Sequence, residues 1–182
     1  MIRLRKYFTA MCGLLRLCRE EFWNGGRIRL QGVHYYIGPG VKVRVSPSAF
    51  VDLGKKTWLD KDVYISASGN IQIGTNNYFN SNCKVVAMSG IRIGNNNLFG
   101  PNVIIVDHNH RYDDPNKLIC EQGFVSAPIT IGSNIWIGGN VTICQGVSIA
   151  DGVIVGANSV VTKSITEPGV YAGTPVKKIS DR

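Results

Sequence analysis

The side chains best suited to chemistry in this chain are two histidines, His108 and His110, which directly follow Asp107. A neutral imidazole can accept a proton near physiological pH, so it suits a general base that deprotonates a hydroxyl or an amine. Two interpretations without catalysis compete with this one: a histidine that hydrogen-bonds a loop carbonyl, and a two-residue fragment of a metal site. The structural elements that carry His108 and His110 decide between catalysis and these two interpretations.

A metal site is the less favoured interpretation. A catalytic zinc ion needs three protein ligands and an open position, and His34 lies far from His108 and His110 in the chain. The sequence also has cysteines without metal-ligand spacing: Cys12, Cys18, Cys83, Cys120 and Cys144. Their odd number is typical of free thiols in a reducing compartment. We therefore expect a cytoplasmic protein without a bound metal.

The histidines lie beside a strict sequence repeat. From Ile131 to Thr166 the chain repeats every six residues, and each hexad opens with Ile or Val. This period fits neither a heptad nor a 3.6-residue helix face, and it is typical of short stacked strands with a turn after each strand. Asn and Gly, which are frequent in this chain, suit corners where φ is positive. The pattern predicts an all-β hexapeptide-repeat solenoid, a parallel β-helix.

The same phase extends toward the N-terminus and locates an insertion. Coils begin at Leu53, Ile73 and Ile93, which are evenly spaced, whereas the next coil begins only at Ile131, almost twice that spacing further on. This gap predicts an inserted loop over residues 106–128, which opens with the histidine pair. A long excursion from a regular repeat is functional more often than not.

Stacking of three hexads per coil aligns small residues on successive coils. Gly139 lies three hexads before Ala157, and Ala157 lies three hexads before Pro175, with Trp136 just ahead of them. Such residues form a smooth lane that an extended ligand can approach, although glycines at corners also satisfy backbone geometry alone. Near the far end of the lane lie residues that suit phosphate groups: Thr162, Lys163, Lys177 and Lys178.

Residues 1–30 do not follow the repeat, and they hold seven Arg and Lys against two Glu, which gives +5 of the net charge of +8. Apolar residues recur in this segment at helical spacing: Leu4, Phe8, Met11, Leu15, Cys18 and Phe22. We expect a basic amphipathic helical segment over 1–30, followed by a β-helix domain over 31–182 that opens with an imperfect coil at 33–51. The apolar stripe either covers the first coil or a sister subunit, or lets residues 1–23 lie on an anionic membrane surface.

The N-terminal segment fits poorly as a transmembrane span, a secretory signal or a nucleic-acid-binding segment. Arg16 and Arg19 interrupt its apolar run before the run is long enough to span a membrane. No small-x-small cleavage site follows it, as a secretory signal would require. The sequence has no aromatic-basic interleaving or known nucleic-acid module, so we expect no nucleic-acid partner.

The hexads, the histidine-bearing insertion and the segments Pro128–Gly138 and Ala172–Ile179 resemble the hexapeptide-repeat O-acetyltransferases. The resemblance includes the maltose and galactoside acetyltransferases and enzymes that acetylate surface polysaccharides, and it covers roughly residues 50–180. It implies a left-handed parallel β-helix, which departs from the usual right-handed crossover rule. It also implies acetyl-CoA as the donor and a homotrimer with three active sites between neighbouring prisms.

The resemblance also implies roles for individual residues. His108 matches the family's catalytic histidine, which takes the proton of a sugar hydroxyl as that oxygen attacks the thioester directly, without an acyl-enzyme. A backbone N–H near Gly139 would stabilise the oxyanion. Asn80 and Tyr78 match acceptor-binding positions, and Asp107 and His110 either orient His108 or bind the acceptor. The positions that match the coenzyme A groove are Trp136, Gly139, Ala157, Thr162 and Lys163, with Lys177 near the nucleotide end.

Departures from the galactoside enzymes shift the expected acceptor. Those enzymes have acidic residues where this chain has Ala87 and Met88, and their N-terminal module is not recognisable in residues 1–30. We therefore expect an acetyltransferase of surface polysaccharide or glycan biosynthesis, acting on a lipid-linked or nucleotide-activated sugar at the inner face of the plasma membrane. N-acetylation of an amino or nucleotide sugar, acetylation of an antibiotic, and a non-catalytic β-helix binding module remain as alternatives.

Overall fold

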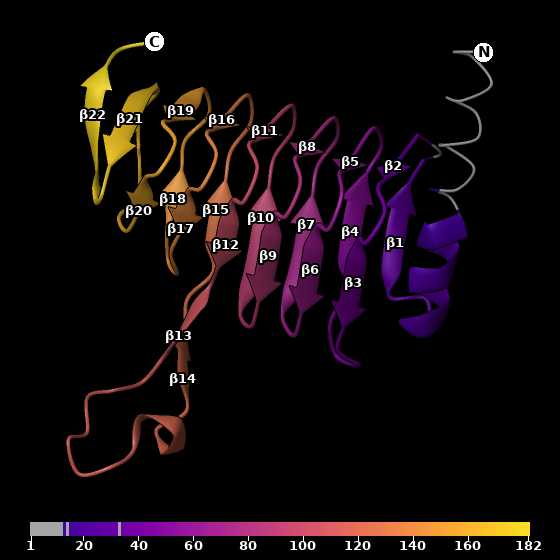
Figure 1. Ribbon diagram of the computed structural model, residues 1–182, viewed down its shortest axis with the longest axis horizontal. Coiled ribbons are helices and arrows are strands. Elements are labelled where there is room, and N and C mark those ends of the chain that lie inside the picture. Colours follow the sequence, from indigo (N-terminus) through magenta and orange to yellow (C-terminus); the bar gives the residue numbers. More distant parts are fainter. Residues whose placement is uncertain (1–12, 14, 33) are drawn as a thin grey trace.

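The computed structural model describes residues 13, 15–32 and 34–182 of the chain. Short parallel strands wind into a left-handed parallel β-helix, whose three sheets form the sides of a prism (Figure 1). The fold class predicted from the hexads is confirmed.

The three sheets take strands in turn from successive coils. The first sheet contains β1 (Ile28–Gln31), β4 (Val51–Gly54), β7 (Asn70–Ile73), β10 (Gly90–Ile93), β15 (Ile129–Ile131) and β18 (Ser148–Ile149). The second contains β2 (Tyr36–Ile37), β5 (Trp58–Leu59), β8 (Tyr78–Phe79), β11 (Leu98–Phe99), β16 (Trp136–Ile137), β19 (Val153–Val155), β21 (Gly169–Gly173) and β22 (Val176–Ser180). The third contains β3 (Lys42–Val45), β6 (Tyr64–Ala67), β9 (Lys84–Ala87), β12 (Ile104–Val106), β17 (Thr142–Ile143) and β20 (Val160–Val161).

The strand register confirms the stacking inferred from the sequence. Leu53 pairs with Ile73, Ile73 with Ile93, and Ile93 with Ile131 across the insertion. All four side chains are buried in the prism. Like residues therefore stack along the axis and fill the core, because successive coils place them one strand spacing apart.

The first coil begins earlier than expected. Leu30 in β1 pairs with Leu53, so the coil starts at Ile28 rather than in the predicted segment 33–51. In β1 the buried Ile28 and partly buried Leu30 alternate with the exposed Arg29, which is the two-residue period of a strand. The high basic content of the N-terminal segment concealed this pattern.

The last coil breaks the six-residue period that the sequence analysis extended to Thr166. Ile165 bridges Ile149, and Tyr171 pairs with Val155, so this coil is shorter than three full hexads. The predicted alignment of Ala157 with Pro175 is therefore wrong. The register brings Gly173 to that position, and the chain then reverses into the antiparallel strand β22.

Asparagines occupy most of the tight corners in the left-handed backbone conformation. Asn102, Asn140 and Asn158 all have φ of 58°, and their side-chain amides form a ladder with N···O distances of 2.9 and 3.0 Å. Asparagine tolerates this conformation better than other residues with a Cβ atom. The positive-φ corners expected from the Asn and Gly content are confirmed.

Asn140→Ala is expected to lower the free energy of unfolding by about 1–2 kcal/mol, because alanine is strained at this φ and ends the ladder. Asn140→Gly relieves the strain and loses the ladder alone, so it should be the more stable of the two variants. Urea unfolding at one protein concentration measures both values. Equal stability of the two variants would contradict the argument from backbone strain.

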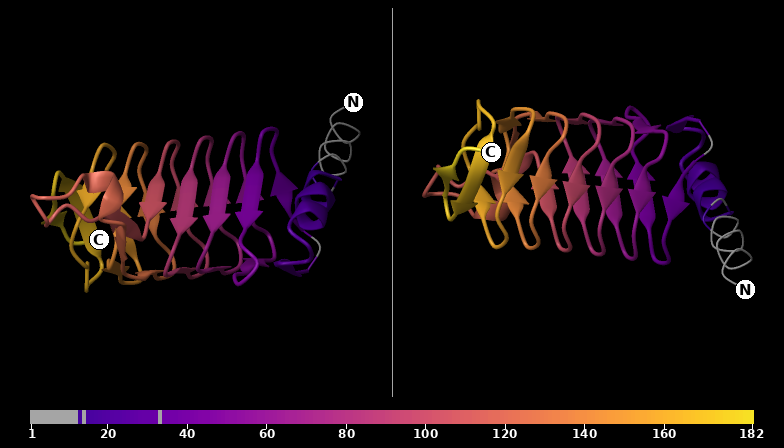
Figure 2. Two further views of the ribbon diagram at one scale, coloured as in Figure 1. Left: turned by 90° about the horizontal axis from the view of Figure 1, so that it is seen from below. Right: turned by 90° about the horizontal axis from the view of Figure 1, so that it is seen from above.

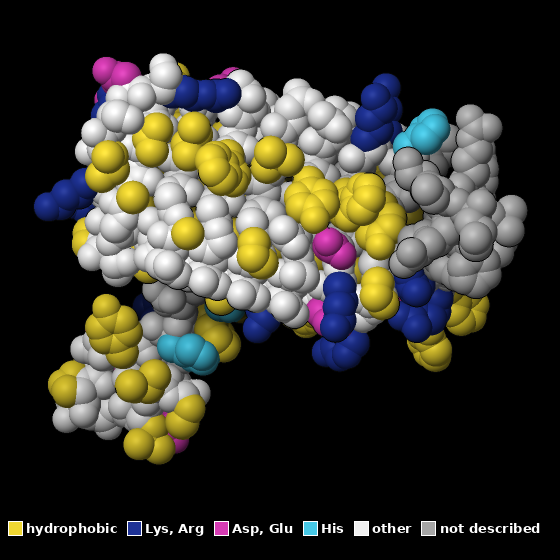
Figure 3. Space-filling view, turned by 45° about the horizontal axis from the view of Figure 1, so that its top comes forward, with side chains coloured by type: hydrophobic (Ala, Val, Ile, Leu, Met, Phe, Trp, Pro, Cys, Tyr) yellow, Lys and Arg dark blue, Asp and Glu magenta, His cyan; other side chains and the backbone are white. Residues whose placement is uncertain are grey.

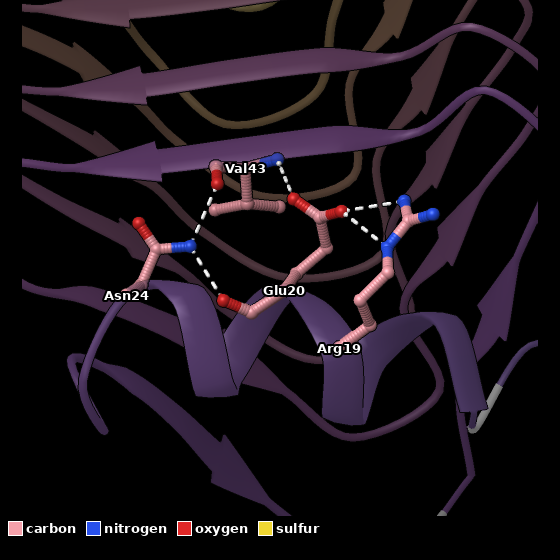
Figure 4. A network of polar contacts seen from close by, with 4 residues as sticks. All are labelled: Arg19, Glu20, Asn24 and Val43. Carbon is pink, nitrogen blue, oxygen red and sulfur yellow. Dashed lines mark hydrogen bonds and ion pairs between the residues drawn. The ribbon is translucent and has the colours of Figure 1, made fainter.

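A helix over residues 15–23 covers the N-terminal end of the prism. Figure 2 shows it at one end, with the C-terminal strands at the other. Glu20 accepts the N–H of Val43 at 3.0 Å, and Asn24 donates to the Val43 carbonyl at 2.8 Å (Figure 4). Asn24 also accepts the N–H of Val45 at 2.7 Å. Strand β3 is the open edge of the third sheet. These side chains therefore satisfy edge groups that would otherwise lack partners.

The helix packs through a different face from the predicted apolar stripe. Leu17 is 1% exposed and lies in the core cluster, whereas Leu15 and Phe22 are 64% and 80% exposed and Cys18 is also exposed. Of the alternatives for this stripe, coverage of the first coil is wrong for these three residues, whereas contact with a sister subunit or a membrane surface stays a prediction. Polar partners at the sheet edge decide the packing face, since unpaired backbone groups are costly to bury. Leu4, Phe8 and Met11 lie outside the described residues.

The insertion forms an arm that projects from the side of the prism (Figure 1). Its root is the antiparallel pair β13 (His108–His110) and β14 (Phe124–Ser126), and it contains the short 3₁₀ helix η1 (Ile119–Glu121). Among the described residues, no helix has both the length and the hydropathy needed to cross a bilayer.

Candidate active site

Asp107 is fully buried at the corner that joins the third sheet to the first. Its Oδ1 accepts the N–H of Met88 at 2.7 Å, and its Oδ2 accepts the N–H groups of Ser89 and Gly90 at 2.8 and 2.7 Å. Such charge-assisted bonds hold the corner of the preceding coil in place. The buried carboxylate is suited to orienting a neighbour, and it has no surface with which to contact an acceptor.

His108 is the first residue of β13 and pairs with Ser126 at the root of the arm. Its Nδ1 lies 3.3 Å from Oδ1 of Asp107, and its side chain remains 19% exposed. In the tautomer with the proton on Nδ1, this nitrogen donates a hydrogen bond to Oδ1 of Asp107. Nε2 is then unprotonated and can accept a proton from a substrate. A histidine with one nitrogen held by a buried carboxylate and some exposed surface has the arrangement of a general base.

His110 is exposed, and its ring lies tilted against the ring of Phe124, with centroids 4.4 Å apart. Phe124 also lies edge-on to the His108 ring, with centroids 6.0 Å apart. Sequence reasoning missed this phenylalanine. Only the hairpin pairing brings it to the histidines, and no repeat within the insertion indicates that pairing.

Tyr78 and Asn80, the predicted acceptor contacts, lie on β8 and at the corner after it. The Tyr78 hydroxyl donates to Oδ2 of Asp60 at 3.1 Å. Partial burial and this hydrogen bond raise the pKa of Tyr78, so the phenol stays protonated. Sequence reasoning missed Asp60, although its place one coil before Asn80 marks it as the equivalent corner position.

Side chains cap backbone N–H groups at two corners between the second and third sheets. Oδ1 of Asp60 accepts the N–H of Lys61, and Oδ1 of Asn80 accepts the N–H of Ser81, both at 2.7 Å. These are local bonds of the kind that Asp and Asn form in turns.

Two later coils lack this cap. Gly138 and Gly156 occupy the equivalent positions, and the N–H groups of Gly139 and Ala157 have no acceptor in the described part of the chain. A Cβ atom on Gly138 would lie 2.6 Å from the Ala157 nitrogen, so this glycine is required by coil packing. The lane at this corner therefore presents free N–H donors as well as small side chains.

Trp136 lies beside this lane on the outer face of β16 and is 54% exposed. It stands in a row of outward residues on the second sheet, paired with Leu98 on one side and Ile154 on the other. Its indole is therefore accessible to a ligand or to another protein surface.

Two basic residues at the C-terminal end differ in their surroundings. Lys178 makes ion pairs with Asp181 at 2.8 Å and with Glu167 at 3.0 Å, and these bonds raise its pKa. Lys177 is exposed on β22 and makes no ion pair within the described residues. Lys177 is therefore the freer of the two to meet an anionic ligand.

The predicted site residues do not meet within one chain. One group lies at the corner between the third and first sheets: Asp107, His108, His110, Thr162 and Lys163. The other lies on the second sheet or at its corner with the third: Tyr78, Asn80, Trp136, Gly139, Ala157 and Lys177. The third sheet, one whole side of the prism, separates the two corners.

No group of three or more His, Cys, Asp or Glu side chains gathers in a metal-binding arrangement among the residues that the structure describes. The expectation that the protein binds no metal remains a prediction.

Comparisons with known proteins agree with this architecture. The family model for the bacterial transferase hexapeptide (six repeats) matches residues 128–163. A galactoside acetyltransferase in complex with coenzyme A is 40% identical, with a TM-score of 0.66, over 72% of this chain and 64% of that one. A maltose O-acetyltransferase from Clostridium difficile 630 is 30% identical, with a TM-score of 0.53, over 80% of this chain and 68% of that one.

A curated Mycobacterium tuberculosis protein, named as a probable acetyltransferase, is 27% identical over 78 residues, which is 43% of this chain and 26% of that protein. The chain thus spans about a quarter of this relative and slightly less than two thirds of the galactoside enzyme. Repeat, coil register and similarity to the maltose enzyme lead to one assignment: the chain belongs to the hexapeptide-repeat acyltransferase family.

Proposed function

We propose that the chain is an acetyl-CoA-dependent O-acetyltransferase that acts on a sugar hydroxyl in surface polysaccharide or glycan biosynthesis. The observation that carries this proposal is His108, held 3.3 Å from a fully buried carboxylate at the root of the arm. The 40% identity to a galactoside acetyltransferase bound to coenzyme A supports both the donor and the sugar acceptor.

In the proposed reaction, Nε2 of His108 takes the proton from the acceptor hydroxyl as its oxygen attacks. Asp107 keeps Nδ1 protonated and the ring oriented, and it stabilises the imidazolium that forms. Direct transfer needs no covalent intermediate on the protein, so neither a serine nor a cysteine nucleophile is required. Burial raises the pKa of Cys83 to about 11, which makes this thiol a poor nucleophile at neutral pH.

Acetyl-CoA supplies the thioester carbonyl that is attacked. The free N–H of Gly139 suits the oxyanion that develops there, and a preorganised donor of this kind contributes about 3–4 kcal/mol. Trp136 and Ala157 of one copy and Thr162 and Lys163 of a neighbouring copy would line the coenzyme, with Lys177 near its nucleotide end. Their small, exposed or cationic side chains fit an extended ligand with phosphate groups.

Two copies are needed to complete the proposed site, because its two groups of residues lie on different corners of one prism. We propose a homotrimer in which each site joins the His108 corner of one copy to the Gly139 lane of the next. Exposed apolar side chains on the arm support such a contact (Figure 3). They are Tyr112, Leu118, Ile119 and Phe124.

The function is tested by measuring release of free coenzyme A from acetyl-CoA in the presence of a panel of sugars, amino sugars and nucleotide sugars. An O-acetyl product is cleaved by mild base, whereas an N-acetyl product is stable, so product chemistry separates the proposal from amino-sugar or antibiotic N-acetylation. If coenzyme A does not bind at millimolar concentration, the chain is a non-catalytic β-helix and the proposal is wrong.

Ala157→Phe is expected to raise the Kd for coenzyme A at least tenfold, because the aromatic ring fills the lane, whereas Thr130→Phe on the exposed face of the first sheet leaves this Kd unchanged.

Mixing Ala157→Phe chains with His108→Ala chains, each inactive alone, is expected to restore activity if the site is shared between copies. Random reassembly pairs an intact base with an intact lane at about one quarter of the interfaces. No recovery after mixing would contradict a site shared between copies.

The proposed setting is the cytoplasm, at the inner face of the plasma membrane, where lipid-linked or nucleotide-activated sugars would serve as acceptors. This location remains a prediction from the free thiols and the basic N-terminal segment.

A further inference from the structure

The outer face of the N-terminal helix carries large apolar side chains that lie outside the core cluster of the described residues. Leu15, Phe22 and Trp23 are 64%, 80% and 76% exposed, and Cys18 beside them is also exposed. The rings of Phe22 and Trp23 touch edge to face, with centroids 5.9 Å apart. We call these four residues the terminal face.

The terminal face is not needed to close the prism. Leu17, Glu20 and Asn24 make the cap from the opposite side of the helix, and Arg16 adds a hydrogen bond to the Ile37 carbonyl at 3.0 Å. The helix is thus fastened by one face while a separate apolar face points away from the protein. Contiguous exposed apolar side chains of this kind mark interaction surfaces.

The charge of the protein is concentrated at the same end. The described residues up to 64 hold nine Arg and Lys against five Asp and Glu, a net charge of +4, whereas residues 65–182 hold eight against seven. One of the five acids, Glu20, is buried and bonded to Val43 and Arg19. Because the coils succeed one another along the axis, this difference in sequence is a difference between the two ends of the prism.

We propose that the terminal face docks the prism end-on to a bilayer with anionic headgroups. Trp23 and Phe22 would enter the interfacial region, where aromatic side chains are favoured. The basic residues of the first coils would attract the headgroups and add to binding, by about a factor of five per residue near the surface. Both signals lie at one end, and stable anchoring of a peripheral protein usually takes two.

A second copy of the chain fits the terminal face less well. Two terminal faces in contact would bring together two ends whose described residues each carry a net charge of +4, which like-charge repulsion opposes. An oligomer with its prisms side by side leaves the ends uncovered. The inference does not depend on acetyl transfer, because lipid binding is measured without either substrate.

Flotation of the full-length protein with vesicles tests the proposal. Wild type is expected to float with vesicles of phosphatidylcholine that contain about one third phosphatidylglycerol, to float weakly with pure phosphatidylcholine, and to dissociate as salt rises. Phe22→Ala/Trp23→Ala should lower partitioning about tenfold or more, since it removes most of the inserted apolar surface. The control is Ile179→Ala on β22 at the opposite end of the prism, where the side chain is 64% exposed, and it should float like wild type.

The unfolding midpoint of the Phe22→Ala/Trp23→Ala variant should match that of wild type, which separates loss of docking from loss of folding. Equal flotation of wild type and this variant would overturn the proposal. So would a wild-type chain that ignores anionic vesicles but associates end to end in a way that the variant abolishes, because a second copy would then occupy the terminal face.

Discussion

His108→Ala is expected to lower kcat for acetyl transfer by about 10²–10⁴-fold, the usual contribution of a positioned general base. The Kd for coenzyme A should stay within about twofold, because His108 acts on the acceptor and its truncation leaves the buried Asp107 bonds to the preceding coil intact. Steady-state kinetics with a responsive sugar, together with calorimetric titration of coenzyme A, measure the two values.

His110→Ala is the control for this prediction. His110 is exposed and rests on Phe124 without a carboxylate partner in the described residues. It should retain activity within about tenfold of wild type, because it lacks the held ring nitrogen that His108 has. The reverse pattern, with His110→Ala inactive and His108→Ala active, would assign the base to His110 and refute the role proposed for His108.

Asp107→Ala is expected to lower the free energy of unfolding by at least about 3 kcal/mol. It removes the three partly buried hydrogen bonds from the N–H groups of Met88, Ser89 and Gly90, and a hydrogen bond to a charged group contributes about 1.5–3 kcal/mol. Activity should also fall, because His108 loses the partner of Nδ1. Chemical denaturation at a fixed protein concentration gives the stability change.

Asp107→Asn separates the two roles of this residue. An amide keeps the shape and one acceptor oxygen, so the corner should be less destabilised than in Asp107→Ala. It cannot stabilise the His108 imidazolium as a carboxylate does, so kcat should still fall. Wild-type stability in Asp107→Ala would show that the three N–H bonds do not hold the corner.

Much of the architecture could be predicted from the spacing of apolar residues. The positions Leu53, Ile73, Ile93 and Ile131 are in register, and the insertion lies in the long gap between the last two of them. This succeeds because each coil contacts only its neighbours, so the repeat in sequence is directly the repeat in space. The prediction failed at both ends of the solenoid, where a coil has a neighbour on one side only.

The errors at the ends have local physical causes. At the N-terminus, the bonds of Glu20 and Asn24 to the open edge of β3 decide which helix face packs, and hydrophobic periodicity does not register them. At the C-terminus, the last coil is shorter than the others. Gly173, and not Pro175, therefore aligns with Ala157 of the preceding coil. The core still places Ile165 beside Ile149, because the shortened corner keeps the apolar side chain inside.

The histidine pair and the small residues of the lane could be recognised in the sequence. The repeat by itself determined on which coil and at which corner of the prism each of them lies. Only the tertiary structure decided what these residues touch. It buries Asp107 against three N–H groups of another coil, and it leaves the N–H groups of Gly139 and Ala157 without acceptors in the part of the chain described. A six-residue period specifies position along the prism and around it, whereas hydrogen-bond partners depend on neighbours that are distant in the chain.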